Sequence, residues 1–216
     1  MQAGRTALDP RALAIQPQRE AGVRRYNSVL QGADALLREE GLNGFSIPAL
    51  ADRLSYTRRS IYKFFPTPYA VLNALTEEYL ERLDAHLRSA AAHMGEALPW
   101  DQAVTAVNTE AANFHNAHPV ARLLILGGAV TDESFRVTEY AIHKLGRLLH
   151  ELLAQRALAV PADPDVASIA VDIGTAVFRV SNLYHGRVTP QYAAESAHAM
   201  VAYLHKYVQP DGEAAA

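Results

Sequence analysis

The sequence predicts an all-α fold, and three observations lead to that prediction. Apolar residues recur at spacings of three and four along most of the 216-residue chain, which is the spacing of one helix face. Proline and glycine divide the chain into lengths typical of helices. No run of alternating β-branched residues is long enough to indicate a sheet. We therefore expect about nine helices, in a small N-terminal unit of three helices and a larger body.

Residues 1–20 contain arginines and prolines but little apolar periodicity, so we predict a flexible N-terminal arm there. The first helix is expected from about Ala21 to Glu40, and Gly41 ends it. Its apolar stripe consists of Tyr26, Val29, Leu30, Ala33, Leu36 and Leu37.

Two short helices should follow, each with a hydroxyl side chain as its N-cap. Ser46 caps the first of them, whose apolar face consists of Ile47, Leu50, Ala51 and Leu54. A tight link then leads to Thr57, which caps the second, from Arg58 to Phe65. Pro66 closes that helix, so residues 21–66 are expected to form one domain.

The larger body is expected at residues 67–209, followed by a frayed tail at residues 210–216. Thr67 and Pro68 are typical of the cap and the first position of a long helix that reaches about His93. The further helices are expected at Asp101 to Asn116, Pro119 to Leu126, Asp132 to Ala159, Pro164 to Arg187 and Pro190 to Val208.

Composition restricts the chemistry and the compartment. The chain has no cysteine, which excludes disulfides, cysteine-bound zinc and thiol nucleophiles. Charged residues and prolines interrupt Met1 to Glu20, so we find no secretory signal there and expect a cytoplasmic protein. The formal net charge of −3 is uneven, because residues 1–66 carry +4 and residues 67–216 carry −7. A basic N-terminal segment on an acidic body favours local attraction to a polyanion.

The outward face of the third helix favours nucleic acid as that polyanion. With Ile61 and the phenylalanines pointing inward, the helical period leaves Arg58, Arg59, Ser60, Tyr62 and Lys63 pointing outward. Cations mixed with hydroxyls can hydrogen-bond base edges and phosphates together. The same residues are also typical of a solvated charged face on an ordinary helical hairpin.

From Arg24 to Leu72 the sequence resembles the N-terminal domain of the TetR family of regulators. The matching helix patterns are Arg25, Val29, Leu30, Ala33, Leu36, Leu37 and Gly41, then Ser46, Leu50 and Ala51, then Ser60-Ile61-Tyr62-Lys63-Phe64-Phe65-Pro66-Thr67. The resemblance implies a helix-turn-helix transcriptional repressor whose segment Thr57 to Lys63 enters the major groove of operator DNA. The DNA-binding residues that it implies are Ser46, Thr57, Arg58, Arg59, Ser60, Tyr62 and Lys63.

Three positions depart from the family pattern. Pro68 and Tyr69 stand where members usually have Lys-Glu, so the usual lysine contact to phosphate is missing. Ser55 replaces the usual turn glycine, so either the turn avoids positive φ or Ser55 carries strain. Arg59 replaces a small residue, so the operator sequence does not carry over from the family.

The segment Val166 to Tyr184 is apolar or small almost all round, so it must be covered on two sides. Its length also suits a membrane span, but Asp172 and Arg179 in mid-segment oppose one, and we expect no membrane partner. The resemblance implies that the last two helices, Pro164 to Arg187 and Pro190 to Val208, pair with a second copy as a homodimer. Such a dimer would read a palindromic operator with half-sites roughly 34 to 36 Å apart.

A small-molecule effector is expected in the body, where the resemblance implies that its binding moves the helix Thr67 to His93 and releases the DNA. Asn108 and His115, seven residues apart, flank an apolar seam on their helix. The candidate ligand-binding residues are Asn108, His115, Tyr140, His143, Phe178 and Asn182. Each is also typical of an ordinary core or surface position.

Two other functions stay open. An enzyme is one, because the chain has nine histidines, yet it has no His-Glu-x-x-His, no Gly-x-Ser-x-Gly and no phosphate-binding glycine loop. His143 with His150, or His198 with His205, could meet on one helix face, but two ligands are too few to hold a metal without carboxylate support. We therefore expect no catalytic residue, no metal and no cofactor. The other is a helical ligand-binding or interaction protein without specific DNA binding.

Overall fold

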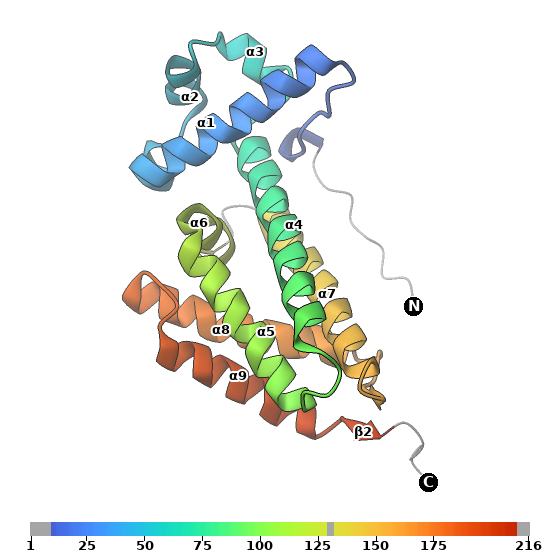
Figure 1. Cartoon of the computed structure of the whole chain (residues 1–216). Helices are drawn as coiled ribbons and strands as arrows, with labels where there is room; N and C mark the ends of the chain where they lie inside the picture. Colours follow the sequence, from blue (N-terminus) through green and yellow to red (C-terminus); the bar gives the residue numbers. More distant parts are fainter. Residues whose placement is uncertain (1–9, 129–131, 211–216) are drawn as a thin grey trace. The chain divides into compact units, whose positions relative to one another are not determined.

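The computed structural model describes residues 10–128 and 132–210. Within these ranges the chain forms nine α-helices, which confirms the predicted all-α class, with a 3-10 turn at Pro10–Ala12 (Figure 1). The chain divides into two compact units, Met1–Tyr79 with Ala129–Val137, and Leu80–Gly128 with Thr138–Ala216. The boundary falls inside helix α4 (Pro68–Met94), later than the predicted boundary at residue 67.

The first unit contains α1 (Glu20–Gly44), α2 (Ile47–Leu54), α3 (Arg58–Tyr62) and the N-terminal part of α4. The apolar stripe predicted on α1 is fully buried. The ring of Tyr26 stacks on Phe65 with centroids 4.7 Å apart and meets Phe64 edge-on at 6.4 Å. These aromatic contacts hold the segment after α3 against α1, so the opposite face of α3 is left outward.

Side-chain caps begin the three helices after α1, as predicted. In each cap a hydroxyl oxygen accepts a hydrogen bond from the amide three residues further on. The pairs are Ser46 with Ala49 at 3.2 Å, Thr57 with Ser60 at 3.3 Å, and Thr67 with Ala70 at 3.1 Å. The caps therefore set where α2, α3 and α4 start.

The local backbone can be compared with the predictions at three places. Gly41 has φ 68° and ψ −169°, so the first helical segment of α1 ends there as predicted, and a further short segment beyond this kink reaches Gly44. Helix α3 is shorter than predicted, because it ends at Tyr62 and the chain then turns to bury the two phenylalanines. Ser55 adopts the left-handed region with φ 53° and ψ 40°, so the α2–α3 turn keeps a conformation that favours glycine.

Residues 10–19 differ from the flexible arm that the sequence predicts. The backbone amide of Ile15 donates to the carbonyl oxygen of Phe64 at 2.7 Å. The buried side chain of Asn73 on α4 donates to the carbonyl oxygen of Ala12 at 3.1 Å. Ala12 is itself buried, so this segment is packed on the first unit. The rest of the predicted arm lies outside the described residues.

The second unit contains α5 (Trp100–Ala117), α6 (Pro119–Leu126), α8 (Val166–His185) and α9 (Pro190–His205). It also contains α4 from Leu80 onward and α7 (Asp132–Ala154) from Thr138 onward. Helix α9 packs against both α8 and α5. Gly174 allows the approach of α8 to α9, because a Cβ atom there would lie 2.5 Å from Sδ of Met200. The core consists of Ala103, Val104, Leu149, Leu152, Leu153, Val166, Ala167, Ala170, Met200 and Leu204.

The predicted helix Asp132 to Ala159 is too long at its C-terminal end. Helix α7 stops at Ala154, and Ala157 has φ 53°. Strand β1 (Leu158–Ala159) then pairs with β2 (Gln209–Pro210) in antiparallel register. The guanidinium of Arg156 donates to the carbonyl oxygens of Gly95 and Leu98, both at 2.8 Å. These tertiary hydrogen bonds stabilise a turn where the local sequence favours more helix.

Candidate functional site

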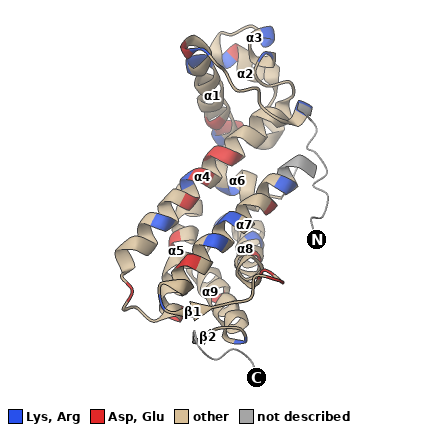
Figure 2. Cartoon of the chain, turned by 90° about the vertical axis from the view of Figure 1, so that its right-hand side faces the viewer, with Lys and Arg blue, Asp and Glu red and all other residues tan. Residues whose placement is uncertain are grey.

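The exposed face of α3 brings together most of the residues predicted to bind DNA. Arg58, Arg59, Tyr62 and Lys63 are exposed, whereas Ile61 between them is fully buried. Figure 2 shows the basic residues of α3 and the neighbouring α2 in blue. Because Thr57 caps α3, the start of the helix and the direction of its side chains are fixed by the sequence.

The hydroxyl groups beside these cations form hydrogen bonds within the protein. Thr57 accepts from the amide of Ser60, and the Ser60 hydroxyl donates back to the Thr57 carbonyl oxygen at 2.7 Å. Ser46 is half-buried at the start of α2 and accepts from Ala49. A hydroxyl can still accept a further hydrogen bond or donate to a different acceptor, so all three can contact a ligand at the surface.

The arginines of the first unit divide into paired and unpaired groups. The described ion pairs join Arg24 to Glu20 at 2.6 Å, Arg38 to Asp34 at 2.7 Å and Arg53 to Glu39 at 2.7 Å. Arg58 and Arg59 take part in none of them. Arg24, Arg38 and Arg53 are therefore balanced within the protein, and Arg25 of α1 lies over the ring of Tyr56 with its Cζ 5.4 Å from the ring centroid. The cations of α3 are available to an external anion such as phosphate.

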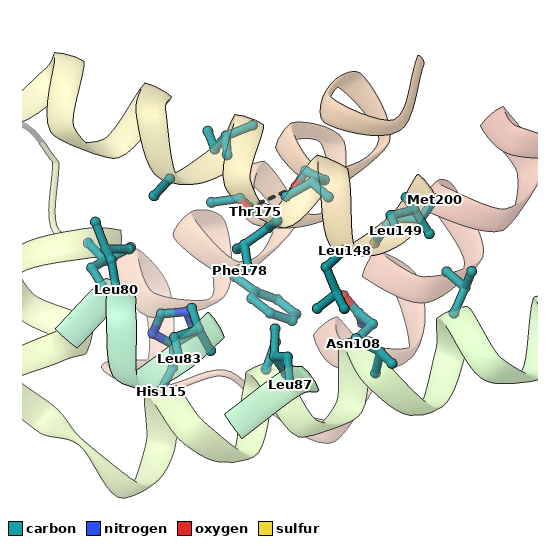
Figure 3. A pocket seen from close by; sticks show the side chains of 18 of the residues that line it. Leu80, Leu83, Leu87, Asn108, His115, Leu148, Leu149, Thr175, Phe178 and Met200 are labelled. Carbon is teal, nitrogen blue, oxygen red and sulfur yellow. Dashed lines mark hydrogen bonds between the residues drawn. The ribbon is translucent and has the colours of Figure 1, made fainter. Parts of the chain in front are cut away.

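The second unit contains a cavity of about 80 Å³ lined by residues of α4, α5, α6, α7, α8 and α9 (Figure 3). Its walls are mostly aliphatic, and α4 supplies Leu80, Leu83 and Leu87 at helical spacing. Three of the predicted ligand-binding residues line it, namely Asn108, His115 and Phe178. The cavity thus has the form of a small-molecule site, with apolar walls and a few polar groups.

Asn108 is engaged inside the protein rather than free for a ligand. Its amide nitrogen donates to the carbonyl oxygen of Ala193 at 3.0 Å. The hydroxyl of Ser196 lies 2.9 Å from its Oδ1 and donates to it. Both polar atoms of this buried side chain therefore connect α5 to α9.

His115 behaves differently, although it is equally buried. Its Nδ1 has no hydrogen-bond partner among the described residues. Burial lowers the pKa of His115 to about 4, with the positive charge of Arg122 and the nearby His118 acting in the same direction. The imidazole is therefore neutral at pH 7. It faces the ring of Phe178, with centroids 6.2 Å apart, and Figure 3 shows both rings directed into the cavity.

The other three predicted ligand-binding residues do not line the cavity. On α7 the lining residues are Thr138, Ala141, Ile142, Leu145, Leu148, Leu149 and Leu152, so Tyr140 and His143 lie on the other side of that helix. Tyr140 is 56% exposed, and Nδ1 of His143 lies 3.1 Å from the Ser168 hydroxyl oxygen. Asn182 is half-buried one turn beyond Phe178. Helical phase, which the sequence pattern left open here, decides the positions of Tyr140 and His143, whereas Asn182 shares the face of Phe178 but lies one turn beyond the cavity.

Sequence reasoning missed the contribution of α4 and Thr175 to the cavity. The signal for α4 was present, because Leu80, Leu83 and Leu87 recur at spacings of three and four. Thr175 carried no such signal, since its hydroxyl donates to the Val171 carbonyl oxygen as in many helices.

Histidines also gather around Asp165, the N-cap of α8. His143 Nδ1 lies 3.3 Å and His150 Nε2 lies 3.6 Å from its carboxylate oxygens. Burial raises the pKa of Asp165, but hydrogen bonds from Ser168 and His143 outweigh it and the net shift is downward. Within the described residues no group of three or more His, Cys, Asp or Glu side chains is arranged to hold a metal ion.

Helix α8 carries an apolar stripe on its outer face. Ile169, Val180, Leu183 and Tyr184 are exposed by 38%, 43%, 77% and 72%. Among the described residues, α8 alone is long and apolar enough to cross a membrane by length and composition, a test that core helices also pass. Its inner face, with Ala170, Gly174 and Phe178, is buried in the second unit. A helix with one face in the core and an exposed apolar stripe on the other is typical of an interface.

Family models match the chain over both units. The model described as bacterial regulatory proteins, tetR family, matches residues 29–75. The model described as tetracyclin repressor-like, C-terminal domain, matches residues 99–204. No curated protein sequence matches the chain.

Solved structures share the fold over most of the chain. A TetR-family transcriptional regulator from Streptomyces coelicolor is 21% identical, with a TM-score of 0.61 over 85% of this chain and 99% of its own. A Mesorhizobium loti protein assigned to the same family is 15% identical, with a TM-score of 0.64 over 88% of this chain and 99% of its own. SmeT, the repressor of the Stenotrophomonas maltophilia multidrug efflux pump SmeDEF, is 17% identical, with a TM-score of 0.56 over 87% of this chain and 91% of its own. At these identities the likeness shows the fold.

Proposed function

The chain belongs to the TetR family of bacterial regulatory proteins, and from this premise we propose that it is a ligand-responsive transcriptional repressor. It binds a palindromic operator as a homodimer and releases the DNA when a small molecule enters the second unit. Its place is the cytoplasm, with operator DNA as partner. The family and fold are those of transcriptional regulators, which are not enzymes, and we propose no catalytic role.

The observation that carries this proposal is the unpaired cationic face of α3. Arg58 and Arg59 are exposed without an ion pair, next to Tyr62 and Lys63, whereas Arg53 on α2 is held by Glu39. A helix entering the major groove needs cations for phosphates and side chains that reach base edges. Thr57, Ser60 and Ser46 supply hydroxyls beside them.

The outer stripe of α8 supports dimerisation through α8 and α9. Ile169, Val180 and Leu183 are large apolar side chains in contact with solvent in the single chain. Pairing with the same surface of a second copy would bury them in a four-helix arrangement, and a two-fold axis would relate the two α3 helices. A Leu183→Arg variant should sediment as a monomer, and Val23→Arg on α1 is the control. A dimer that survives Leu183→Arg contradicts this interface.

The cavity supports an effector site because α4 is shared by both units. Leu80, Leu83 and Leu87 belong to the cavity wall, and the same helix begins at Pro68 directly after the α3 segment. A ligand that binds better to one arrangement of α4 shifts the population toward it, and a coupling of about 1 to 3 kcal/mol is ordinary for such switches.

Fluorescence anisotropy on the DNA upstream of the protein's own gene, against scrambled DNA, tests the DNA-binding part. The wild type should bind the upstream DNA selectively. An Arg58→Ala/Arg59→Ala variant should lose that binding, and its log–log salt slope should fall by about 2 if both residues contact phosphate. Arg24→Ala/Arg38→Ala removes the same charge from α1 and serves as the matched control. Equal, weak binding of both DNAs by the wild type would contradict a specific repressor and favour a helical interaction protein.

A further inference from the structure

We propose that the cavity of the second unit takes an uncharged, ring-sized apolar molecule with one hydroxyl-like group, and that His115 recognises that group. This inference rests on the proposed effector function of the cavity and specifies the chemistry of its ligand.

The composition of the wall requires an uncharged ligand. The described residues that line the cavity are aliphatic or aromatic apart from Asn108, His115, Thr138 and Thr175, and they include no Asp, Glu, Lys or Arg. A charged ligand would be taken out of water without an opposite charge to pair with it. Burial also keeps His115 neutral at pH 7, so the ring offers no cation to an anionic ligand.

Among the polar groups of the wall, His115 has an unused hydrogen-bonding atom. Both polar atoms of Asn108 are bonded to α9, and the Thr175 hydroxyl donates within α8. Nδ1 of His115 has no partner in the described part of the chain, although the side chain is only 3% exposed. A buried polar atom without a partner is unfavourable, so a ligand that supplies the partner gains affinity from relieving it.

The form of the neutral ring specifies the kind of group that it binds. A neutral imidazole has one nitrogen that donates and one that accepts, and a hydroxyl can pair with either. An engineered apolar cavity of about 150 Å³ takes benzene. The cavity of about 80 Å³ therefore limits the ligand to at most one small ring, and the leucines of α4 and the ring of Phe178 that line it must shift outward when a substituted ring enters.

Phenol and toluene make a matched pair of probes, because they share a ring and differ in a hydroxyl against a methyl group. Their dissociation constants are measured by calorimetry on the full-length protein without DNA, together with benzoate as the charged probe. The wild type should bind phenol at least tenfold more tightly than benzoate. In His115→Phe the ratio of the phenol dissociation constant to the toluene dissociation constant should rise about tenfold or more. Toluene binding should change by less than about threefold in the same variant.

His118→Phe, which alters a histidine outside the cavity wall, should keep the wild-type ratio of phenol to toluene. The inference is overturned if His115→Phe also keeps that ratio, if benzoate binds as tightly as phenol, or if the wild type binds neither phenol nor toluene. The benzoate comparison uses the wild type alone, so it remains decisive even if His115→Phe does not fold. Selective DNA binding without phenol binding would refute this inference and leave the proposed repressor function standing. Phenol binding without selective DNA binding would refute the repressor function and leave the assigned ligand chemistry standing.

Discussion

Replacing His115 with phenylalanine should change how the stability of the protein depends on pH. Burial lowers the pKa of His115 from its ordinary value near 6.5 to about 4. Between these values the unfolded chain binds a proton that the folded protein does not bind, so folding stability falls as pH decreases from about 6.5 to about 4. Well above pH 6.5 the residue is neutral in both states and the effect disappears. From pH 7 to pH 5 the loss caused by His115 amounts to about 2 kcal/mol.

Urea unfolding at pH 7 and pH 5 measures this difference, at one fixed protein concentration because unfolding of a dimer depends on it. The wild type should lose about 2 kcal/mol more than His115→Phe over this interval. At pH 7 the variant should be at least as stable as the wild type, because it removes a buried nitrogen without a partner. His198→Gln, which removes an exposed histidine of α9, should keep the wild-type pH dependence. Equal pH dependence of wild type and His115→Phe would refute the reasoning.

Three further substitutions test local contacts within each unit. Ser55→Gly should raise the free energy of unfolding by up to about 1 kcal/mol, because glycine adopts the positive φ of this turn without strain. Urea titrations measure the change, and a lower stability of the variant would contradict strain at Ser55. Asn73→Leu should remove the hydrogen bond to the Ala12 carbonyl oxygen and speed cleavage by trypsin at residues 11 and 19 severalfold. An unchanged cleavage rate would show that this hydrogen bond does not hold residues 10–19 in place. Asn108→Ala should lower the free energy of unfolding by about 1 to 2 kcal/mol, because the Ala193 carbonyl oxygen loses a buried donor, whereas the Ser196 hydroxyl can still donate to the Gly174 carbonyl oxygen at 3.0 Å. Thermal melts that show no change would disprove that role.

Local signals were sufficient to predict the helix caps, the apolar stripe of α1 and the outward face of α3 in the first unit. The hydroxyl caps at Ser46, Thr57 and Thr67 act through atoms three residues away, and the stripe of α1 follows from helical spacing. The outward face of α3 could be predicted for the same reason, because burial of Ile61 leaves its neighbours on a five-residue helix exposed.

The cavity depended on tertiary packing. The sequence singled out Asn108, His115 and Phe178, but it could not distinguish them from Tyr140 and His143, because all are polar or aromatic residues on amphipathic helices. Only the packed rotation of α7 turns Thr138 inward and Tyr140 outward. Likewise only the fold shows that Asn108 is satisfied by α9 while His115 is not.

The sequence by itself therefore determined the helical class, the caps and the exposed cationic face of α3, since these arise from interactions within a few residues of the chain. The tertiary structure decided where α7 ends, that residues 10–19 pack on the first unit, and which polar side chain of the cavity is left without a partner. Those features depend on atoms brought together from distant segments, such as Arg156 with Leu98 and Asn73 with Ala12, and no local pattern encodes such pairs.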